Sequence, residues 1–450
     1  MADSNLPLTS RCPFGRTMRD THFMLAPTYT PLNHGSFGTY PKPVQRRLHE
    51  CQTLSEARPD NFQRYDFPVM LDRSRAAMAS FLDVPVDEVV FVPNATTAIN
   101  VVLQNLGFES GEMILHLSTL YGSVAKMIEY IHETRGVESI NVAVDYPIND
   151  DVLVSRFQKA IKDVKFGKKR RVGVAIFDTI SSSPGVRVPW ERLVEVCREE
   201  NVLSLVDGAH GVGQIDLGLS KVQPDFFTSN CHKWLYVPRA CAVFHVPKRN
   251  QHLIRTSLPT SHGFVPKPRD SSKVIMNPLM NDSLGKSPFV VLFEFVATLD
   301  VSPYLCVEEA LKFRREVCGG EEKIMKYCEE ISSEAGRLAV KILGTDIMEN
   351  ETESLTKCAF TNVHLPLEIG DGQGQIPEKD MYLVAVWMTA MLVRESDIYS
   401  AVFFHARRFW TRISGQIYLD LGDFEKGARA LKALCERAKS GEYLQAKARL

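Results

Sequence analysis

The sequence predicts an α/β protein whose mostly parallel sheet is covered by helices on both faces. Short apolar stretches alternate with longer amphipathic ones: residues 113–118, 139–146 and 171–181 are typical of buried strands, and residues 123–133 and 150–164 of the helices between them. A strand that is apolar throughout is buried on both faces, and parallel neighbours need a helical crossover. The alternation therefore predicts a doubly covered parallel sheet.

The same alternation begins earlier and continues further along the chain. The further elements that we expect are helices over residues 44–58, 71–82 and 190–200 and strands over residues 89–94, 202–207 and 225–230. From residue 307 the pattern changes to long helices over 307–317 and 321–343, strands within 357–366 and 401–420, and a last helix over 423–439. We therefore expect an N-terminal arm over residues 1–43, a large α/β domain over 44–300 and a smaller C-terminal α/β domain over 301–450.

Composition excludes several classes of function. The 53 basic and 54 acidic residues nearly cancel, which argues against a nucleic-acid or anionic-membrane surface. Ten cysteines without paired spacing are typical of reduced thiols in an intracellular protein, and the histidines and cysteines lack the spacing of a metal site. Because no signal peptide or apolar span is apparent, we expect a soluble cytoplasmic protein. The last residues, Ala448-Arg449-Leu450, loosely match a peroxisomal address, so that compartment stays open.

Two polar residues at predicted strand ends indicate chemistry. Asp207 ends the strand over residues 202–207, and Lys233 follows the strand over residues 225–230. Ligands of open α/β sheets bind at the carboxyl ends of the strands. Bulky Trp234 and Leu235 could keep the lysine partly desolvated and nucleophilic, and an aspartate could pair with a cationic ring nitrogen. Pyridoxal phosphate requires this pair of groups, although a solvated lysine and a turn-forming aspartate would give the same pattern.

Other strand ends carry further candidates. Thr96 and Thr97 begin a predicted helix, where amide and hydroxyl groups could bind a phosphate or cap the helix. Tyr121 follows the next strand, where its phenol could stack on a cofactor or transfer a proton. Ser181 and Ser182 belong to a Ser/Pro/Gly turn that either faces a substrate or is a plain turn.

Two of these segments resemble a known family. The segments VDGAHGVGQIDL and SNCHKWL resemble the core of the fold-type I pyridoxal-phosphate enzymes of aminotransferase class V. The resemblance implies that Lys233 attaches the cofactor and that Asp207 pairs with its ring nitrogen. It places His210 near the phenolic oxygen of the cofactor. The implied phosphate ligands are Thr96, Thr97, Ser229 and His232 from this chain and Thr298 from a partner chain.

The resemblance also implies an amino-acid site in a homodimer. Arg412, before a Ser-x-x-x-Tyr segment, matches the arginine that holds the substrate α-carboxylate, with Arg407 and Arg408 as nearby rivals. The remaining substrate-side candidates are Asn33, His34, Ser181, Ser182 and His262. His262 and Thr298 match positions that reach the neighbouring subunit's cofactor phosphate, which makes a two-fold dimer the expectation.

A finer resemblance covers nearly the whole chain. The segments NHGSFGTYP, EARP, NATTAIN, YGSVAK, SSSPGVR and HARRFW are similar to those of fungal hercynylcysteine sulfoxide lyases of ergothioneine biosynthesis. Such enzymes break a cysteine Cβ–S bond by β-elimination, and the position of Tyr121 holds the acid near the leaving sulfur. This chain departs from the pattern in having His210 where glutamine is usual and a shortened connection over residues 368–378. These departures leave the substrate open.

Four alternatives remain from sequence. The same anchors would serve an amino-acid epimerase resembling isopenicillin N epimerase, or a carbon–carbon bond-forming enzyme resembling those of loline alkaloid assembly. A cysteine desulfurase would need a reactive cysteine on a mobile loop, whereas Cys306, Cys318, Cys328 and Cys358 lie in helix-like or strand-like contexts. The last alternative is a pyridoxal-phosphate-binding protein without turnover, against which the presence of Lys233, Asp207, Tyr121 and Arg412 argues.

Overall fold

The protein is described by a computed structural model over residues 12–166, 170–267 and 285–447. Its large domain is built on a seven-stranded sheet in the order β2-β8-β7-β6-β5-β3-β4. The strands are β2 (Val89–Val92), β3 (Glu112–Leu117), β4 (Glu138–Val142), β5 (Arg171–Asp178), β6 (Leu203–Asp207), β7 (Phe226–Asn230) and β8 (Ala242–His245). Neighbouring strands are parallel except at β8, which runs antiparallel to β2 and β7. The predicted, mostly parallel α/β sheet is confirmed.

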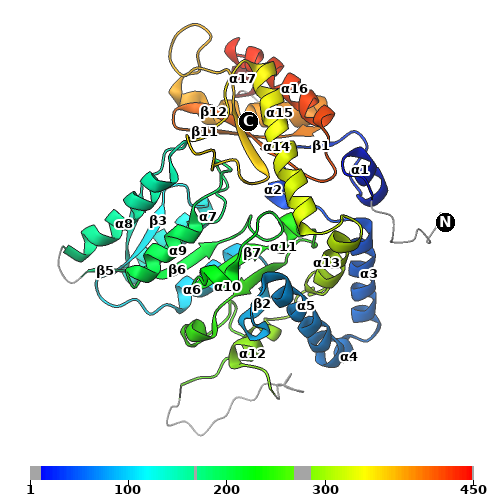
Figure 1. The fold of residues 1–450 in the computed structure, drawn as a ribbon, viewed down its shortest axis with the longest axis vertical. Coiled ribbons are helices and arrows are strands. Elements are labelled where there is room, and N and C mark those ends of the chain that lie inside the picture. Colours follow the sequence, from blue (N-terminus) through cyan, green and yellow to red (C-terminus); the bar gives the residue numbers. More distant parts are fainter. Residues whose placement is uncertain (1–11, 167–169, 268–284, 448–450) are drawn as a thin grey trace.

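Helices cover both faces of this sheet (Figure 1). Successive side chains of a strand point to opposite faces. In β5, Val174 and Ile176 pack in one apolar cluster with α6 (Ala95–Asn105), α7 (Gly122–Arg135) and α12 (Pro288–Glu294). Ala175 and Phe177 pack in the other, with α8 (Asp150–Phe166) and α9 (Trp190–Glu199). The sheet is therefore buried on both sides, which is why its strands are apolar throughout.

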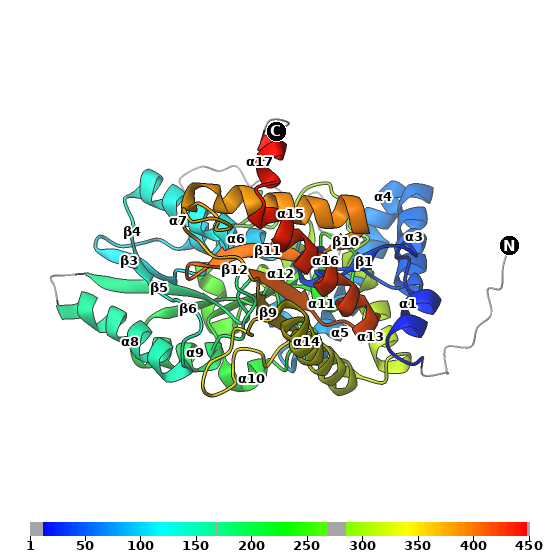
Figure 2. The same ribbon diagram turned by 90° about the horizontal axis from the view of Figure 1, so that it is seen from above.

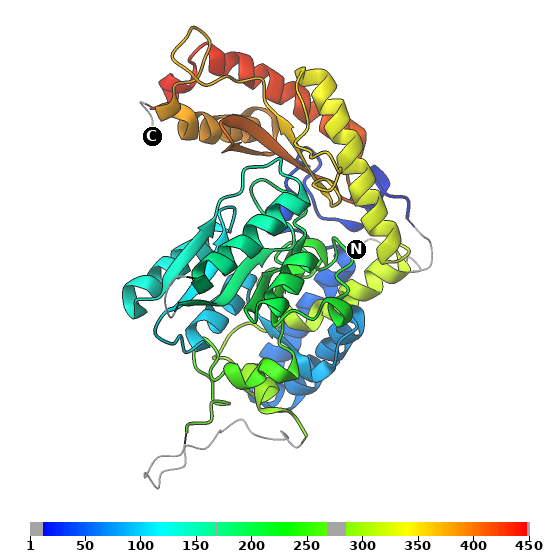
Figure 3. The same ribbon diagram turned by 60° about the vertical axis from the view of Figure 1, so that its left-hand side comes forward.

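The smaller C-terminal domain lies over the carboxyl edge of the large sheet (Figure 3). Its three-stranded antiparallel sheet has the order β11-β12-β9, with β9 (Phe360–His364), β11 (Ala401–His405) and β12 (Arg408–Ser414). Three long helices pack with it, α14 (Glu321–Leu343), α15 (Met381–Ser396) and α16 (Leu421–Lys439), and they are seen from above in Figure 2. The prediction missed α15.

The N-terminal arm packs against the small domain before it enters the large one. Its elements are α1 (Arg16–His22), β1 (Thr30–Pro31) and α2 (His34–Phe37). Met18, Phe23 and Leu32 lie in the apolar core of the small domain, and β1 pairs with β10 (Ile398–Tyr399). Within the arm, α2 forms a short helix that packs beside α11 (Cys231–Trp234).

The remaining elements connect these layers. They are α3 (Lys42–Ala57), α4 (Pro59–Asn61), η1 (Phe62–Asp66), α5 (Phe67–Leu82), η2 (Val86–Glu88), α10 (Leu219–Val222), η3 (Lys248–Leu253), η4 (Tyr304–Cys306), α13 (Val307–Glu316), η5 (Glu378–Asp380) and α17 (Tyr443–Lys447). All ten cysteines are buried and free, as expected for reduced thiols. No helix in the described ranges is long and apolar enough to cross a membrane. The C-terminal tripeptide that suggested peroxisomal targeting lies outside the described residues.

Candidate active site

The carboxyl ends of β5, β6 and β7 bring the predicted cofactor-side residues together. Asp178 ends β5 directly opposite Asp207, which ends β6, and Lys233 lies in the short helix that follows β7. The Lys233 Nζ atom lies 3.2 Å from Nε2 of His210. Desolvation by burial lowers the pKa of Lys233 to about 8, and the positive charge of Arg412 also lowers it, while Asp207 and Asp178 oppose the shift. A lysine amine with a lowered pKa is available as a nucleophile and base near neutral pH.

Asp207 is a buried carboxylate with no ion-pair partner among the described residues. Its Oδ1 accepts a hydrogen bond of 2.9 Å from the amide of Ala209, and the side chain is 3% exposed. Burial raises its pKa, and no ion pair among the described residues joins it to a lysine or arginine. A protonated ring nitrogen placed beside it would supply the missing positive charge. Together with the nearby amine of Lys233, this carboxylate fits the aldehyde and pyridine groups of pyridoxal phosphate.

Asp178 is a second buried carboxylate at this edge that the sequence prediction missed. Burial and the neighbouring charge of Asp207 raise its pKa well above the ordinary range. Within the described part of the chain, its Oδ2 has no hydrogen-bond partner. The prediction missed it because the strand was expected to continue to residue 181, whereas β5 ends at Asp178 as β6 ends at Asp207.

The predicted phosphate ligands surround the start of α6. Asn94 caps this helix by accepting from the amide and hydroxyl of Thr97 at 2.8 and 3.1 Å, and the amide of Ala95 donates to Asn230. Thr97 therefore has a capping role in the structure, and Thr96 stands beside it in the first turn. A phosphate placed here would face the positive end of the helix dipole.

The side chains of Ser229 and His232 form hydrogen bonds with the protein backbone. The Ser229 hydroxyl accepts from the amide of Val212 at 3.0 Å. His232 donates from Nδ1 to the carbonyl of Cys241 at 3.1 Å, and burial lowers its pKa to about 4. In the neutral ring this leaves Nε2 as an acceptor, so His232 donates to a phosphate once the ring is protonated. A nearby anion favours that protonation.

Arg412 provides a buried cation on the opposite side of the site. Its guanidinium donates to the carbonyl of Ser182 and, at 2.6 Å, to Oδ1 of Asn33, and it lies 4.5 Å from the centre of the Phe360 ring. Burial lowers its pKa to about 10, and its Nε has no hydrogen-bond partner among the described residues. A buried guanidinium without a carboxylate is suited to bind an anionic group of a substrate.

The two rival arginines lie elsewhere. Arg407 and Arg408 are exposed, and they form ion pairs with Glu378 at 3.7 Å and Asp346 at 3.1 Å. Their positive charges are thus partnered at the surface. The geometry favours Arg412 as the carboxylate-binding residue.

His34 and Ser181 form hydrogen bonds within the protein. His34 donates from Nε2 to the carbonyl of Lys233 at 2.6 Å and accepts at Nδ1 from Tyr418 at 2.7 Å, so both ring nitrogens are used within the protein. Ser181 donates to the carbonyl of Pro184 at 2.6 Å inside its own turn. Both side chains are buried, and they support the backbone at Lys233 and the Ser/Pro/Gly turn. Of this pair of serines, Ser182 reaches the site, through its carbonyl.

Three predicted residues do not join this cluster. Tyr121 precedes α7 with 48% of its side chain exposed, and His262 and Thr298 are exposed as well. Among the described residues, no hydrogen bond connects them to Lys233, Asp207 or Arg412. Their exposure leaves them free to meet a substrate or another subunit.

Arg314 is a further residue that the sequence prediction missed. This fully buried arginine on α13 donates to the carbonyls of Trp234 at 2.7 Å and Gly213 at 2.9 Å, and it pairs with Glu321. It therefore joins the backbone that follows Lys233 to the loop that follows Asp207.

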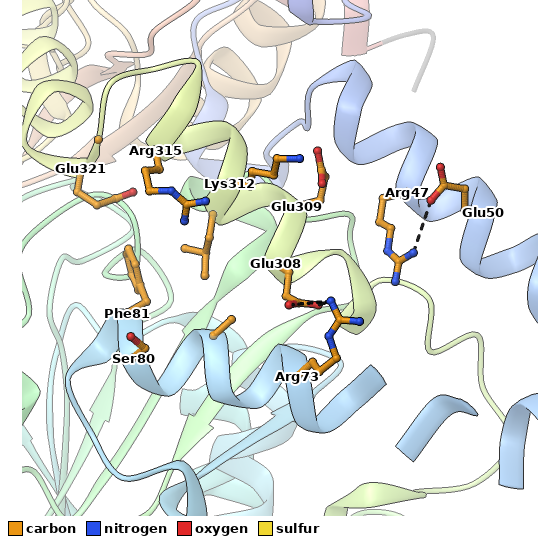
Figure 4. Close-up of a pocket in the computed structure, with 13 residues that line it drawn as sticks. Arg47, Glu50, Arg73, Ser80, Phe81, Glu308, Glu309, Lys312, Arg315 and Glu321 are labelled. Carbon is orange, nitrogen blue, oxygen red and sulfur yellow. Dashed lines mark hydrogen bonds and ion pairs between the residues drawn. The ribbon is translucent and has the colours of Figure 1, made fainter. Parts of the chain in front are cut away.

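Glu321, the partner of Arg314, also lines a cleft of about 800 Å³ between α3, α5 and α13 (Figure 4). Some of the other charged residues that line this cleft form ion pairs with one another. The Arg314–Glu321 pair thus connects the backbone next to Lys233 to a cleft that lies outside the site.

Comparison with known proteins gives consistent matches. The family model described as aminotransferase class V matches residues 63–263. The chain is 36% identical to L-cysteine desulfhydrase-like protein lolT1 of Epichloe uncinata, over 97% of this chain and 99% of that protein. It is 30% identical to hercynylcysteine sulfoxide lyase of Schizosaccharomyces pombe, over 97% of this chain and 100% of that protein.

Solved structures share the fold at lower identity. A structure of a C-DES mutant with glycine covalently linked to the PLP cofactor superposes with a TM-score of 0.74 at 15% identity, over 92% of this chain and 98% of that one. At this identity the likeness establishes the fold, which is the fold-type I architecture predicted from sequence.

Proposed function

The chain belongs to the aminotransferase class V family of pyridoxal-phosphate enzymes, and from this premise we propose that it is a carbon–sulfur lyase acting on a cysteine S-conjugate sulfoxide of the hercynylcysteine sulfoxide type. The observation that carries the proposal is that a desolvated Lys233 amine and a buried Arg412 lie within one site, and that no ion pair among the described residues joins Arg412 to a carboxylate. This arrangement suits an α-amino acid held by its carboxylate with its α-carbon near a base.

The side chains would divide the reaction between them. Arg412 and Asn33 hold the α-carboxylate, Asp207 keeps the ring nitrogen of pyridoxal phosphate protonated, and Thr96, Thr97, Ser229 and His232 surround its phosphate. When bound, pyridoxal phosphate supplies an electron sink for the electron pair left at the α-carbon. The amine of Lys233 takes the α-proton, the Cβ–S bond breaks with its electrons going to the sulfinyl group, and Tyr121 donates a proton to the sulfenate that departs. Water then releases pyruvate and ammonia from the three-carbon fragment.

The buried cysteines argue against a desulfurase. Such an enzyme needs an accessible thiolate, but Cys306, Cys318, Cys328 and Cys358 are each at most 3% exposed. Burial raises the pKa of Cys318, Cys328 and Cys358 to about 12, which keeps them as thiols.

A second candidate is a lyase that acts on free cysteine. It is favoured by the 36% identity to a protein named L-cysteine desulfhydrase-like. The test records the visible spectrum of the purified protein, then adds hercynylcysteine sulfoxide or cysteine in separate assays for pyruvate and ammonia. Release of both products from the sulfoxide supports the proposal, and release from cysteine alone supports the second candidate. A coloured protein that releases neither product would favour an epimerase or a carbon–carbon bond-forming enzyme.

We also propose a cytoplasmic homodimer. The exposed positions of His262 and Thr298 support the dimer, since these side chains match positions that serve a neighbouring site. Ten free, buried cysteines support a reducing compartment.

The rate at which pyridoxal phosphate attaches to the apo protein should rise with pH. The neutral Lys233 amine attacks the aldehyde, and its pKa is lowered to about 8. Below that pH the neutral fraction grows about tenfold per pH unit, and above it the fraction is nearly constant. The growth of visible absorbance after mixing measures the rate. A rate that still rises tenfold per unit between pH 9 and pH 10 would contradict the lowered pKa.

Tyr121→Phe should lose most of the elimination while keeping the cofactor. The substitution removes the hydroxyl proposed to protonate the departing sulfenate, and general acids contribute roughly 10²- to 10⁴-fold to such steps. We expect pyruvate formation to fall about a hundredfold or more with an unchanged visible spectrum. Tyr130→Phe is the matched control, since Tyr130 is an exposed tyrosine within α7, the helix that Tyr121 precedes. Unchanged pyruvate formation by Tyr121→Phe would remove Tyr121 from the mechanism.

A further inference from the structure

His210 is held between Lys233 and Trp234 by both of its ring nitrogens. Its Nε2 lies 3.2 Å from the Lys233 amine, and its Nδ1 lies 3.3 Å from the indole Nε1 of Trp234. The ring is 2% exposed and meets Phe360 edge to face, with ring centres 5.1 Å apart. The imidazole therefore has no freedom to exchange its two partners.

These contacts determine where the imidazole hydrogen lies. An indole N–H is a donor and has no acceptor lone pair, so Nδ1 of His210 has to accept from Trp234. Burial holds the pKa of His210 well below its ordinary value, and the charges of Lys233 and Arg412 act in the same direction. The ring is thus neutral and carries one hydrogen, which lies on Nε2 and points to the lysine side of the site. With the hydrogen on Nδ1, two donors would face each other at Trp234. With the hydrogen on Nε2, the Lys233 amine accepts it when that amine is neutral, which holds above its pKa of about 8 or once the amine is bound to the cofactor.

We infer that Trp234 is a positioning residue that holds His210 as the Nε2–H tautomer, so that this histidine presents a hydrogen-bond donor to the phenolic oxygen of the cofactor. The inference rests on the proposed function, because it needs pyridoxal phosphate in this site. A phenolate oxygen requires a donor, whereas the other tautomer would turn a lone pair toward it. A glutamine at position 210 would present its amide N–H without such help.

This difference between histidine and glutamine gives the test. We expect Trp234→Phe to weaken pyridoxal phosphate binding about tenfold or more, since hydrogen bonds to charged groups contribute roughly 1.5–3 kcal/mol. In a His210→Gln background the same change should alter the dissociation constant less than about twofold, because an amide has no tautomer to fix. Trp190→Phe is the matched control, since the Trp190 indole is buried and its N–H has no partner among the described residues. It should bind the cofactor like the wild type.

The measurements are the dissociation constant from the visible absorbance of the bound cofactor and the ¹⁵N signals of His210 in the wild-type apo protein, recorded above the Lys233 pKa of about 8 so that the amine is neutral. Signals that place the hydrogen on Nε2 support the inference, and a hydrogen on Nδ1 overturns it whether or not any variant folds. If Trp234→Phe raised the dissociation constant equally in the wild-type and His210→Gln backgrounds, Trp234 would have only a packing role. That result would overturn the inference but leave the proposed function standing. A wild-type protein that takes up no pyridoxal phosphate would overturn the proposed function together with it.

Discussion

Lys233→Ala should reduce the release of pyruvate by at least about a thousandfold. The variant loses both the amine that attaches the cofactor and the base that takes the α-proton, and general bases alone contribute roughly 10²- to 10⁴-fold. The cofactor should still bind through Asp207 and the groups near α6, but a denaturing wash should remove it completely. Mass spectrometry after borohydride reduction measures this loss of covalent attachment, and the pyruvate assay measures the loss of turnover.

Lys286 provides the matched control for this variant. It is also a largely buried lysine, at 17% side-chain exposure, but it forms ion pairs with Asp72 and Glu294 away from the site. Lys286→Ala should keep covalent attachment and turnover, whatever its effect on stability. Full cellular function in a Lys233→Ala strain would mean that the protein acts without turnover, and it would remove the basis of the proposed reaction.

Arg412→Lys should lower kcat/KM about 10- to 150-fold. Lysine keeps the positive charge but loses the two parallel donors that match a carboxylate, and hydrogen bonds to charged groups contribute roughly 1.5–3 kcal/mol. The loss should appear mainly as a higher KM, because the carboxylate is held in the ground state and the transition state alike. The variant should bind pyridoxal phosphate with an unchanged spectrum.

Arg408→Lys is the corresponding control. Arg408 lies on the same strand as Arg412, but it is exposed and paired with Asp346. Its replacement should leave KM within about twofold, as exposed ion pairs contribute little. An Arg412→Lys enzyme with an unchanged KM would show that another group binds the carboxylate.

The cofactor side of the site could be predicted because it depends on strand ends. Asp207 and Lys233 follow apolar strands, and parallel strands bring their carboxyl ends to one edge of the sheet. The same rule would have selected Asp178, which ends the neighbouring strand. A carboxylate at the end of an apolar strand therefore indicates a site residue, and the prediction applied this rule to Asp207 but not to Asp178.

The substrate side was harder to predict, because proximity in space does not fix where a side chain points. His34 was expected near the substrate, yet its buried ring has to satisfy two nitrogens and does so with Tyr418 and the Lys233 carbonyl. Both partners are distant in sequence. Arg314 contacts the backbone carbonyl of Trp234 from 80 residues away, and nothing in its local sequence distinguishes it from the neighbouring Arg315.

The helix α15 was missed for a related reason. Its sequence is almost continuously apolar and so lacks the polar face that reveals a helical period. Val384 and Met388 pack in the small-domain core, whereas Tyr382 and Val386 line an apolar groove beside β11. With apolar side chains on both faces, periodicity cannot separate a helix from a strand.

The pairing of β1 with β10 also bears on the order in which the protein is made. Thr30 lies opposite Ile398, so β1 can pair only after a further 368 residues of the chain have been synthesised. At about 5–20 residues per second, translation takes roughly 20–70 seconds to cover that distance. Asp207 and Lys233 leave the ribosome long before it ends, whereas Asn33 cannot meet Arg412 until the chain is nearly complete. With the roles proposed for these residues, a nascent chain would complete its cofactor site before its substrate site.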